Sequence, residues 1–133
     1  MVFNFDNTYA ALSGKLFTEI IPEKIKNPRL LILNNELLKD LDIEMSDDIT
    51  EYLCANKLTA NPIAMAYAGH QFGHFTMLGD GRAVLLGEQI TRNNERFDIQ
   101  LKGSGITPYS RGGDGKAAAG SMLREYLYSA ALD

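Results

Sequence analysis

One glycine turn and two charged side chains carry the chemistry that this sequence could perform. The turn, Gly79-Asp80-Gly81-Arg82, lies between two apolar runs, and Lys102 ends a later segment in which apolar and polar residues alternate. Backbone N–H groups of a glycine turn can approach phosphate oxygens closely, and a lysine ammonium adds the positive charge that holds them. The sequence therefore indicates a site for a phosphate-bearing ligand.

Glu125 completes the set, 23 residues after Lys102 on a segment with helical periodicity. A lysine side chain is flexible, so a carboxylate from a neighbouring helix is needed to orient its ammonium, as in the lysine and glutamate pair of protein kinases. Taken singly, the turn is typical of a plain hairpin, and Lys102 and Glu125 are typical of solvated surface charges. Only their order along the chain favours a common site.

The elements that must position these side chains can be inferred from the hydrophobic pattern. Phe75 to Leu78 and Ala83 to Leu86 flank the glycine turn, which predicts a hairpin. Arg96 to Lys102 alternates strictly and predicts a third strand. Apolar spacing from about Ala117 to Leu132 predicts a helix. The polar, glycine-rich segment Gly103 to Gly115 is expected to be a mobile or ligand-contacting loop.

The first 60 residues differ in composition from the rest of the chain, because Gly14 is their single glycine. Asn34 or Asn35 is expected to cap a short helix whose leucines at 37, 38 and 41 share a face, and Ser46-Asp47-Asp48 is expected to begin another. Leu30 to Leu33 is expected to be a buried strand or a helix entry. We therefore expect a mainly helical extension over residues 1–60, followed by the ligand-binding part over residues 61–133, together forming one incomplete domain.

Length and composition restrict the class of protein. A chain of 133 residues that is 45% hydrophobic is expected to fold as one domain with a hydrophobic core. Its net charge of −4 argues against binding to nucleic acid or to an anionic membrane, and Cys54 stands alone, so no disulfide can form within the chain. No signal peptide or membrane-spanning run is visible. We expect a bacterial-type cytoplasmic protein.

Four sequence signatures follow one another in the second half of the chain. They are Tyr67-Ala68-Gly69-His70-Gln71-Phe72-Gly73; Leu78-Gly79-Asp80-Gly81-Arg82-Ala83; Gln100-Leu101-Lys102-Gly103-Ser104-Gly105 with Thr107-Pro108-Tyr109-Ser110-Arg111; and Asp114-Gly115 with Arg124-Glu125-Tyr126-Leu127. In this order they resemble the signatures of the selenoprotein O family of protein adenylyltransferases. The resemblance is dense over residues 61–132 and looser over residues 7–43.

The resemblance implies a protein-kinase-like fold, of which this chain would form the N-lobe: an antiparallel sheet with the glycine hairpin and an αC-like helix. Such enzymes bind ATP end for end relative to kinases, with the γ-phosphate buried, and transfer AMP to Ser, Thr or Tyr hydroxyls of other proteins. Glu125 would orient Lys102. The implied ATP contacts are Gly79, Gly81, Arg82, Lys102, Asp114 and Gly115.

The resemblance also implies a second lobe outside these 133 residues, which would carry the general-base aspartate and the ligands for Mg²⁺ or Mn²⁺. No catalytic or metal-binding residue is therefore assigned in this chain. Because positioning and charge neutralisation dominate transfer at phosphorus, we expect the isolated chain to be inactive. If the second lobe normally covers Leu123 and Leu127, the isolated chain is also expected to self-associate.

Some other functions stay open from the sequence, and others are disfavoured. A non-catalytic remnant or interaction module and a kinase-like phosphotransferase stay open as alternatives. A zinc site at His70 and His74 is disfavoured, because glycines interrupt the helix that their spacing would need. Ser110 and Ser121 lack a nucleophile-elbow motif, and the glycines from Gly103 onward lack dinucleotide-binding spacing.

Overall fold

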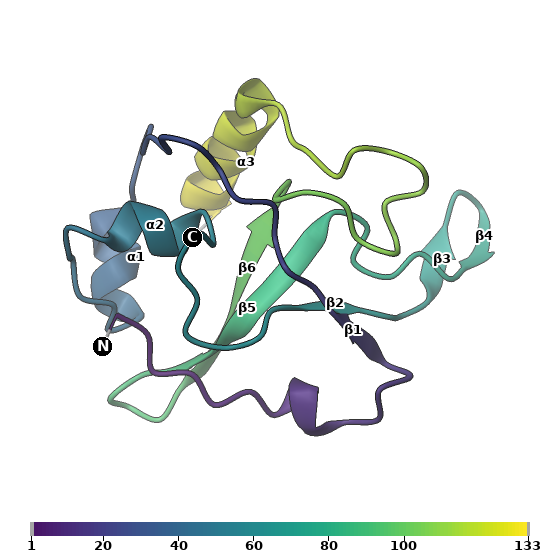
Figure 1. The fold of residues 1–133 in the computed structure, drawn as a ribbon, viewed down its shortest axis with the longest axis horizontal. Helices are drawn as coiled ribbons and strands as arrows, with labels where there is room; N and C mark the ends of the chain where they lie inside the picture. Colours follow the sequence, from purple (N-terminus) through teal and green to yellow (C-terminus); the bar gives the residue numbers. More distant parts are fainter. Residues whose placement is uncertain (1, 133) are drawn as a thin grey trace.

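The computed structural model describes residues 2–132 and has an α+β architecture built on one antiparallel sheet (Figure 1). The sheet has the order β1-β2-β5-β6, formed by Phe17–Glu19, Ile63–Met65, Ala83–Ile90 and Arg96–Lys102. A separate two-stranded sheet pairs β3 (Gly69–Gln71) with β4 (His74–Thr76). The described helices are α1 (Asn35–Asp40), α2 (Ile49–Leu53) and α3 (Ala119–Leu132), with a 3₁₀ turn at Tyr9–Ala11. The α+β class agrees with the sequence prediction.

Strand β5 lies at the centre of the fold. Its residues Val84 to Gln89 are all buried, because β2 and β6 flank it and other segments cover its faces. A second buried cluster lies around α1 and α2 and consists of Phe3, Leu38, Leu41, Ile43 and Ile49. The Gln89 amide joins the two regions, since its Nε2 donates to the Leu41 carbonyl at 3.0 Å. Burial of these apolar side chains supplies the main stabilising free energy.

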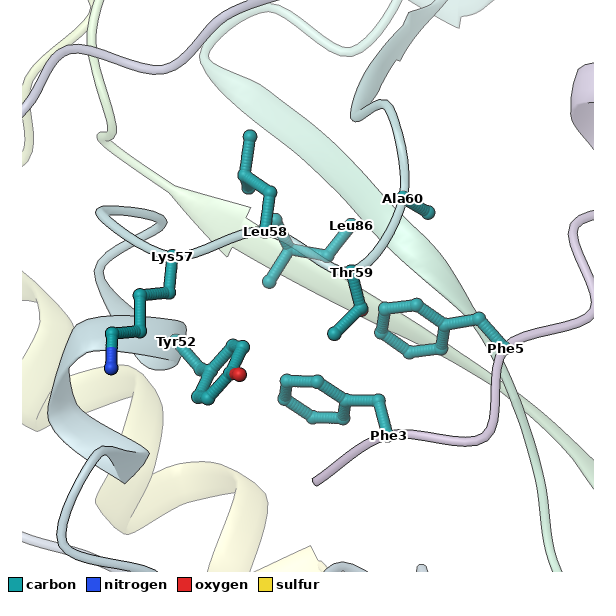
Figure 2. A pocket seen from close by; sticks show the side chains of 8 residues that line it. All are labelled: Phe3, Phe5, Tyr52, Lys57, Leu58, Thr59, Ala60 and Leu86. Atoms are coloured by element: carbon teal, nitrogen blue, oxygen red, sulfur yellow. The ribbon is translucent and has the colours of Figure 1, made fainter. Parts of the chain in front are cut away.

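Aromatic contacts hold the N-terminal segment against β5 (Figure 2). The rings of Phe3 and Phe5 are stacked with centroids 4.8 Å apart, and Tyr52 meets Phe3 edge-on at 6.0 Å. The Phe5 ring also packs directly against the backbone of β5 at Gly87. Only glycine allows this contact, because a Cβ atom at position 87 would lie 2.4 Å from the Phe5 ring. A cavity of only about 10 Å³ remains beside these rings and Leu86, so this region is closely packed.

The buried carboxylate of Glu88 is a second attachment for the same segment. It accepts hydrogen bonds from the Thr8 hydroxyl at 2.7 Å, the Tyr9 N–H at 2.6 Å and Arg96 Nη1 at 2.9 Å. Burial raises the pKa of Glu88, but these donors outweigh it and hold the pKa below its ordinary value. The ionised form therefore stabilises the fold.

Helix α1 begins where the sequence predicts. Asn34 Oδ1 accepts the N–H groups of Glu36 and Leu37, both at 3.1 Å, so the predicted cap is confirmed. Leu38 and Leu41 are buried and Leu37 is 48% exposed, yet all three line the same hollow, so the prediction that they share a face is confirmed. Leu41 is four residues after Leu37 and three after Leu38, so the three side chains lie on one broad face, with Leu37 at its exposed edge.

The hairpin predicted around Gly79 is wrong in its pairing. Strand β4 pairs with β3, whereas β5 pairs with β2 and β6. The turn itself is present, but it is bonded to the end of β2: the Asp80 N–H donates to the Met65 carbonyl at 3.0 Å, and the Gly79 N–H donates to the Tyr67 carbonyl at 3.0 Å. These nonlocal hydrogen bonds prevail over local pairing of the two flanking runs.

Of the remaining secondary-structure predictions, those for the C-terminal half are confirmed more closely than those for residues 1–60. Strand β6 matches the predicted Arg96 to Lys102 residue for residue, and α3 begins two residues after the predicted start. Residues 1–60 hold less helix than expected and contribute β1 to the edge of the sheet. Leu30 to Leu33 forms no strand and Leu31 is 73% exposed, so the buried-strand alternative is wrong, whereas the segment does lead into α1 at its Asn34 cap, as the helix-entry alternative expects. The division at residue 60 stays a prediction.

Helix α3 has little contact with the rest of the fold. None of its residues is buried, and Leu127 is 64% exposed. Within the part of the chain that the structure describes, its one polar contact with the sheet is the ion pair of Glu125 with Lys102. The self-association expected from Leu123 and Leu127 stays a prediction. Among residues 2–132, no helix has the length and apolar character needed to cross a membrane.

Replacing Glu88 by Gln is expected to lower the free energy of unfolding by about 2 kcal/mol at neutral pH, because an amide accepts these charge-assisted hydrogen bonds less well. Folding lowers the pKa of Glu88 below its ordinary value of 4.5. The carboxylate's contribution to the free energy of unfolding is therefore fully present above pH 4.5 and declines as the pH falls below that value. Urea unfolding followed by circular dichroism measures the difference. Glu95→Gln, in the exposed turn before β6, is the matched control. Equal losses in the two variants would contradict the assignment.

Amide hydrogen exchange should separate α3 from the core. We expect the amides of α3 to exchange much faster than those of Val84 to Gln89, because α3 buries no side chain and an exposed ion pair contributes about 1 kcal/mol or less. Mass spectrometry of peptic fragments provides the measurement. Equal protection of the two segments would show that α3 is held by contacts other than the ion pair.

Candidate functional site

The register of β5 against β6 places Lys102 beside the glycine turn. Lys102 lies opposite Ala83, the first strand residue after the turn, and the Gly103 N–H donates to the Arg82 carbonyl at 3.0 Å. The turn between the two strands is closed by the Thr91 N–H, which donates to the Glu95 carbonyl at 3.0 Å. Two segments twenty residues apart in the sequence thus meet at one end of the sheet.

A polar hollow of about 480 Å³ lies at this end of the sheet. It is lined by four of the seven residues that the sequence indicates, namely Gly79, Gly81, Arg82 and Lys102. Strand β3 contributes another part of the wall through His70 and Gln71. The hollow is large enough for a phosphate chain with part of a nucleoside, since ligand pockets range from about 300 to 1,000 Å³.

The two glycines of the turn have different surroundings. Both have positive φ, +55° for Gly79 and +64° for Gly81, a conformation that other residues adopt only with strain. A Cβ atom on Gly79 would lie 2.6 Å from the ring of Tyr109, whereas a Cβ atom on Gly81 would have no heavy atom within 4 Å. Gly79 therefore serves close packing, and the open side of Gly81 is free for a ligand.

The predicted pairing of Lys102 with Glu125 is present. Lys102 Nζ lies 2.6 Å from Glu125 Oε1, and the two side chains are 44% and 51% exposed. The Glu125 side chain lines a different, more apolar hollow of about 690 Å³ between α1, β6 and α3. The carboxylate thus holds the ammonium from the helix side, and the ammonium lies at the wall of the polar hollow. Its role toward a nucleotide stays a prediction.

Asp114 and Gly115 line a neighbouring hollow of about 330 Å³, which shares Gly81 and Arg82 with the first. Gly115 has a φ of +68°, and a Cβ atom there would lie 1.8 Å from the Gly105 carbonyl oxygen, so no other residue fits. Asp114 Oδ1 accepts the Lys116 N–H at 2.9 Å, and Arg82 Nη1 donates to the Lys116 carbonyl at 2.8 Å. The structure therefore brings these two residues next to, and not into, the hollow of Lys102.

Hydroxyl groups of Thr107 and Ser110 attach this loop to the glycine turn. Both donate to the Gly81 carbonyl, the Ser110 hydroxyl at 3.3 Å, and Ser110 Oγ accepts the Thr107 N–H at 2.9 Å. Neither hydroxyl is assigned a role from the sequence. The sequence feature that could have indicated these contacts is the Thr and the Ser on either side of Pro108-Tyr109. Hydroxyl side chains in turns commonly form hydrogen bonds with nearby backbone groups.

Asp80 is a third residue whose role cannot be recognised from the sequence. Its Oδ2 accepts the Met65 N–H at 2.9 Å and so fastens the turn to β2. Burial holds the pKa of the Asp80 carboxyl above its ordinary value. The hydrogen bonds from Met65 and the Tyr67 side chain lower the pKa, but they do not cancel the effect of burial. Asp80 thus shapes the turn between Gly79 and Gly81.

The two histidines do not form a ligand pair. His70 pairs with Phe75, and His74 pairs with Gln71, across the β3–β4 turn. Neighbouring residue pairs on antiparallel strands point to opposite faces, so the imidazoles of His70 and His74 diverge. Within residues 2–132, no group of three His, Cys, Asp or Glu side chains is placed to hold a metal ion.

Comparison with known proteins gives a consistent result. The family model described as "Protein adenylyltransferase SelO" matches residues 1–133. Relatives described as "Protein nucleotidyltransferase YdiU" are 57% identical in Brevibacillus brevis, 54% in Anoxybacillus flavithermus and 54% in Pelagibacter ubique, each over 98% of this chain. The chain spans only 28% of the length of these curated relatives. Because the family model covers the whole of the sequence, the chain belongs to the SelO family of protein adenylyltransferases.

Proposed function

We propose that this chain supplies the nucleotide-binding part of a protein adenylyltransferase, which transfers AMP from ATP to Ser, Thr or Tyr hydroxyls of protein substrates. One observation carries the proposal: the Lys102 ammonium, held by Glu125 at 2.6 Å, lines the same hollow as the glycine turn. Family membership supports nucleotidyl transfer as the class of reaction. A strand lysine, a helix glutamate and an antiparallel sheet also support a kinase-like N-lobe.

ATP would be held through its phosphates. The backbone of the turn at Gly81 offers an open approach, while Arg82 and Lys102 supply positive charge at the same hollow. Asp114 and Gly115 would contact the nucleotide from the adjoining hollow. Such a site contributes position and charge, which dominate catalysis of transfer at phosphorus.

The proposed reaction requires groups beyond these. A substrate hydroxyl oxygen attacks the α-phosphorus of ATP, the bond from that phosphorus to the bridging oxygen breaks, and pyrophosphate leaves. The hydroxyl proton passes to a general base, which we place outside this chain. The implied Mg²⁺ or Mn²⁺ does not fit a site among residues 2–132, so no step is assigned to the metal here. We accordingly propose that the chain alone binds ATP without transferring AMP.

Replacing Lys102 by Ala is expected to weaken ATP binding by the isolated chain about tenfold or more, because a charge-assisted contact to phosphate is lost. Glu125→Gln should cause a smaller loss, since it leaves the ammonium present but less well oriented. Isothermal titration calorimetry measures the affinities. Lys39→Ala, at the exposed end of α1, is the matched control. Equal affinity of Lys102→Ala and the parent chain would refute the assigned phosphate contact.

A chimera tests the reaction itself. This chain would replace the matched segment of the Brevibacillus brevis relative, and the chimera would be incubated with ATP, Mg²⁺ or Mn²⁺ and candidate proteins beside the unsubstituted relative. We expect intact-mass spectra to show addition of AMP, and we expect Lys102→Ala to abolish it. Addition of a phosphoryl group would instead support a kinase-like phosphotransferase. An inactive chimera beside an active relative would support a non-catalytic remnant.

A further inference from the structure

Arg111 occupies the boundary between the two polar hollows. It lines both the hollow of Lys102 and the hollow of Asp114, a property that it shares only with Gly81 and Arg82 among the described residues. A ligand extending from one hollow into the other would therefore pass Arg111. Neither its position in the sequence nor its exposure alone would distinguish it from an ordinary surface arginine.

Each cationic side chain next to Arg111 already makes a polar contact within the protein, whereas Arg111 makes none among residues 2–132. Lys102 pairs with Glu125, and Lys116 Nζ lies 3.2 Å from Glu23 Oε2. Arg82 Nη1 donates to the Lys116 carbonyl. Within residues 2–132, the Arg111 guanidinium makes no hydrogen bond or ion pair. Its five N–H donors therefore remain available to an anion.

The backbone around Arg111 is held in an unusual conformation. Arg111 has a φ of +52° and precedes Gly112, whose φ is +79°; a left-handed conformation is natural for glycine and unfavourable for arginine. The preceding Ser110 is fixed to the Gly81 carbonyl and to the Thr107 N–H. The loop thus directs an arginine to a position where glycine would be the less strained residue, and such strain is often found at ligand-binding sites.

We propose that Arg111 is a phosphate-binding residue that contacts the phosphate chain of the nucleotide from the loop, in the hollow that Lys102 also lines. The inference rests on the proposed function, because it takes a nucleoside triphosphate as the ligand. A guanidinium presents parallel N–H groups that match two phosphate oxygens, so it recognises phosphate geometry as well as charge. Arg111 and Lys102 then both hold the phosphate chain, one from a loop and one from a strand.

The test measures the affinity of the full chain for ATP, for inorganic tripolyphosphate and for adenosine. Arg111→Met is expected to weaken binding of ATP and tripolyphosphate roughly tenfold and to leave adenosine binding unchanged, because adenosine carries no phosphate. Arg111→Lys should restore part of the loss. Arg124→Met, an exposed arginine on α3 that lines neither hollow, removes the same charge and should leave all three affinities unchanged.

A second variant separates binding from folding. Arg111→Gly relieves the left-handed strain, so its melting temperature should equal or exceed that of the parent chain, while its affinity for ATP should fall as in Arg111→Met. Undiminished binding of ATP by Arg111→Met would overturn this inference alone, as would an equal loss of adenosine binding. Failure of the unsubstituted chain to bind either ATP or tripolyphosphate would overturn the proposed function as well.

Discussion

The register between β5 and β6 is the constraint on which the rest of the site depends. It sets Lys102 opposite Ala83 and so delivers the ammonium to the end of the glycine turn. A slip of one residue would turn Lys102 to the other face of the sheet, away from the polar hollow. The register is supported by the closed turn between Thr91 and Glu95 and by the irregularity at Gly87, where the Phe5 ring requires a glycine.

Three sets of hydrogen bonds fix the conformation of the glycine turn next to this register. Asp80 fastens it to β2, the hydroxyls of Thr107 and Ser110 hold the Gly81 carbonyl, and Arg82 reaches the Lys116 carbonyl. The polar side chains thus satisfy the turn's own backbone and leave the open side of Gly81 toward the hollow. By contrast, α3 is attached through an exposed ion pair and no buried side chain, so Glu125 is the least firmly placed part of the site.

The sequence predicts local features well and nonlocal ones poorly. Strict alternation defined β6, and the side chain of Asn34 defined the start of α1, because both depend on neighbours within a few residues. The partners of β5 and the pairing of β3 with β4 depend on contacts between distant segments, which periodicity does not encode. Even the β3–β4 turn carries Phe72 at a φ of +56°, which propensity would not suggest. Among the site residues, the order of glycine, lysine and glutamate was informative, whereas the anchoring roles of Asp80 and Ser110 needed the fold.

The central claim is that the hollow between the glycine turn and Lys102 receives the phosphates of ATP. It is tested most directly by recording two-dimensional amide NMR spectra of the chain during titration with ATP. Binding at this site should shift the amide signals of Gly79 to Arg82 and of Lys102 and Gly103, and leave those of α1 and α2 in place. Saturable shifts confined to other segments, with the turn unaffected, would contradict it.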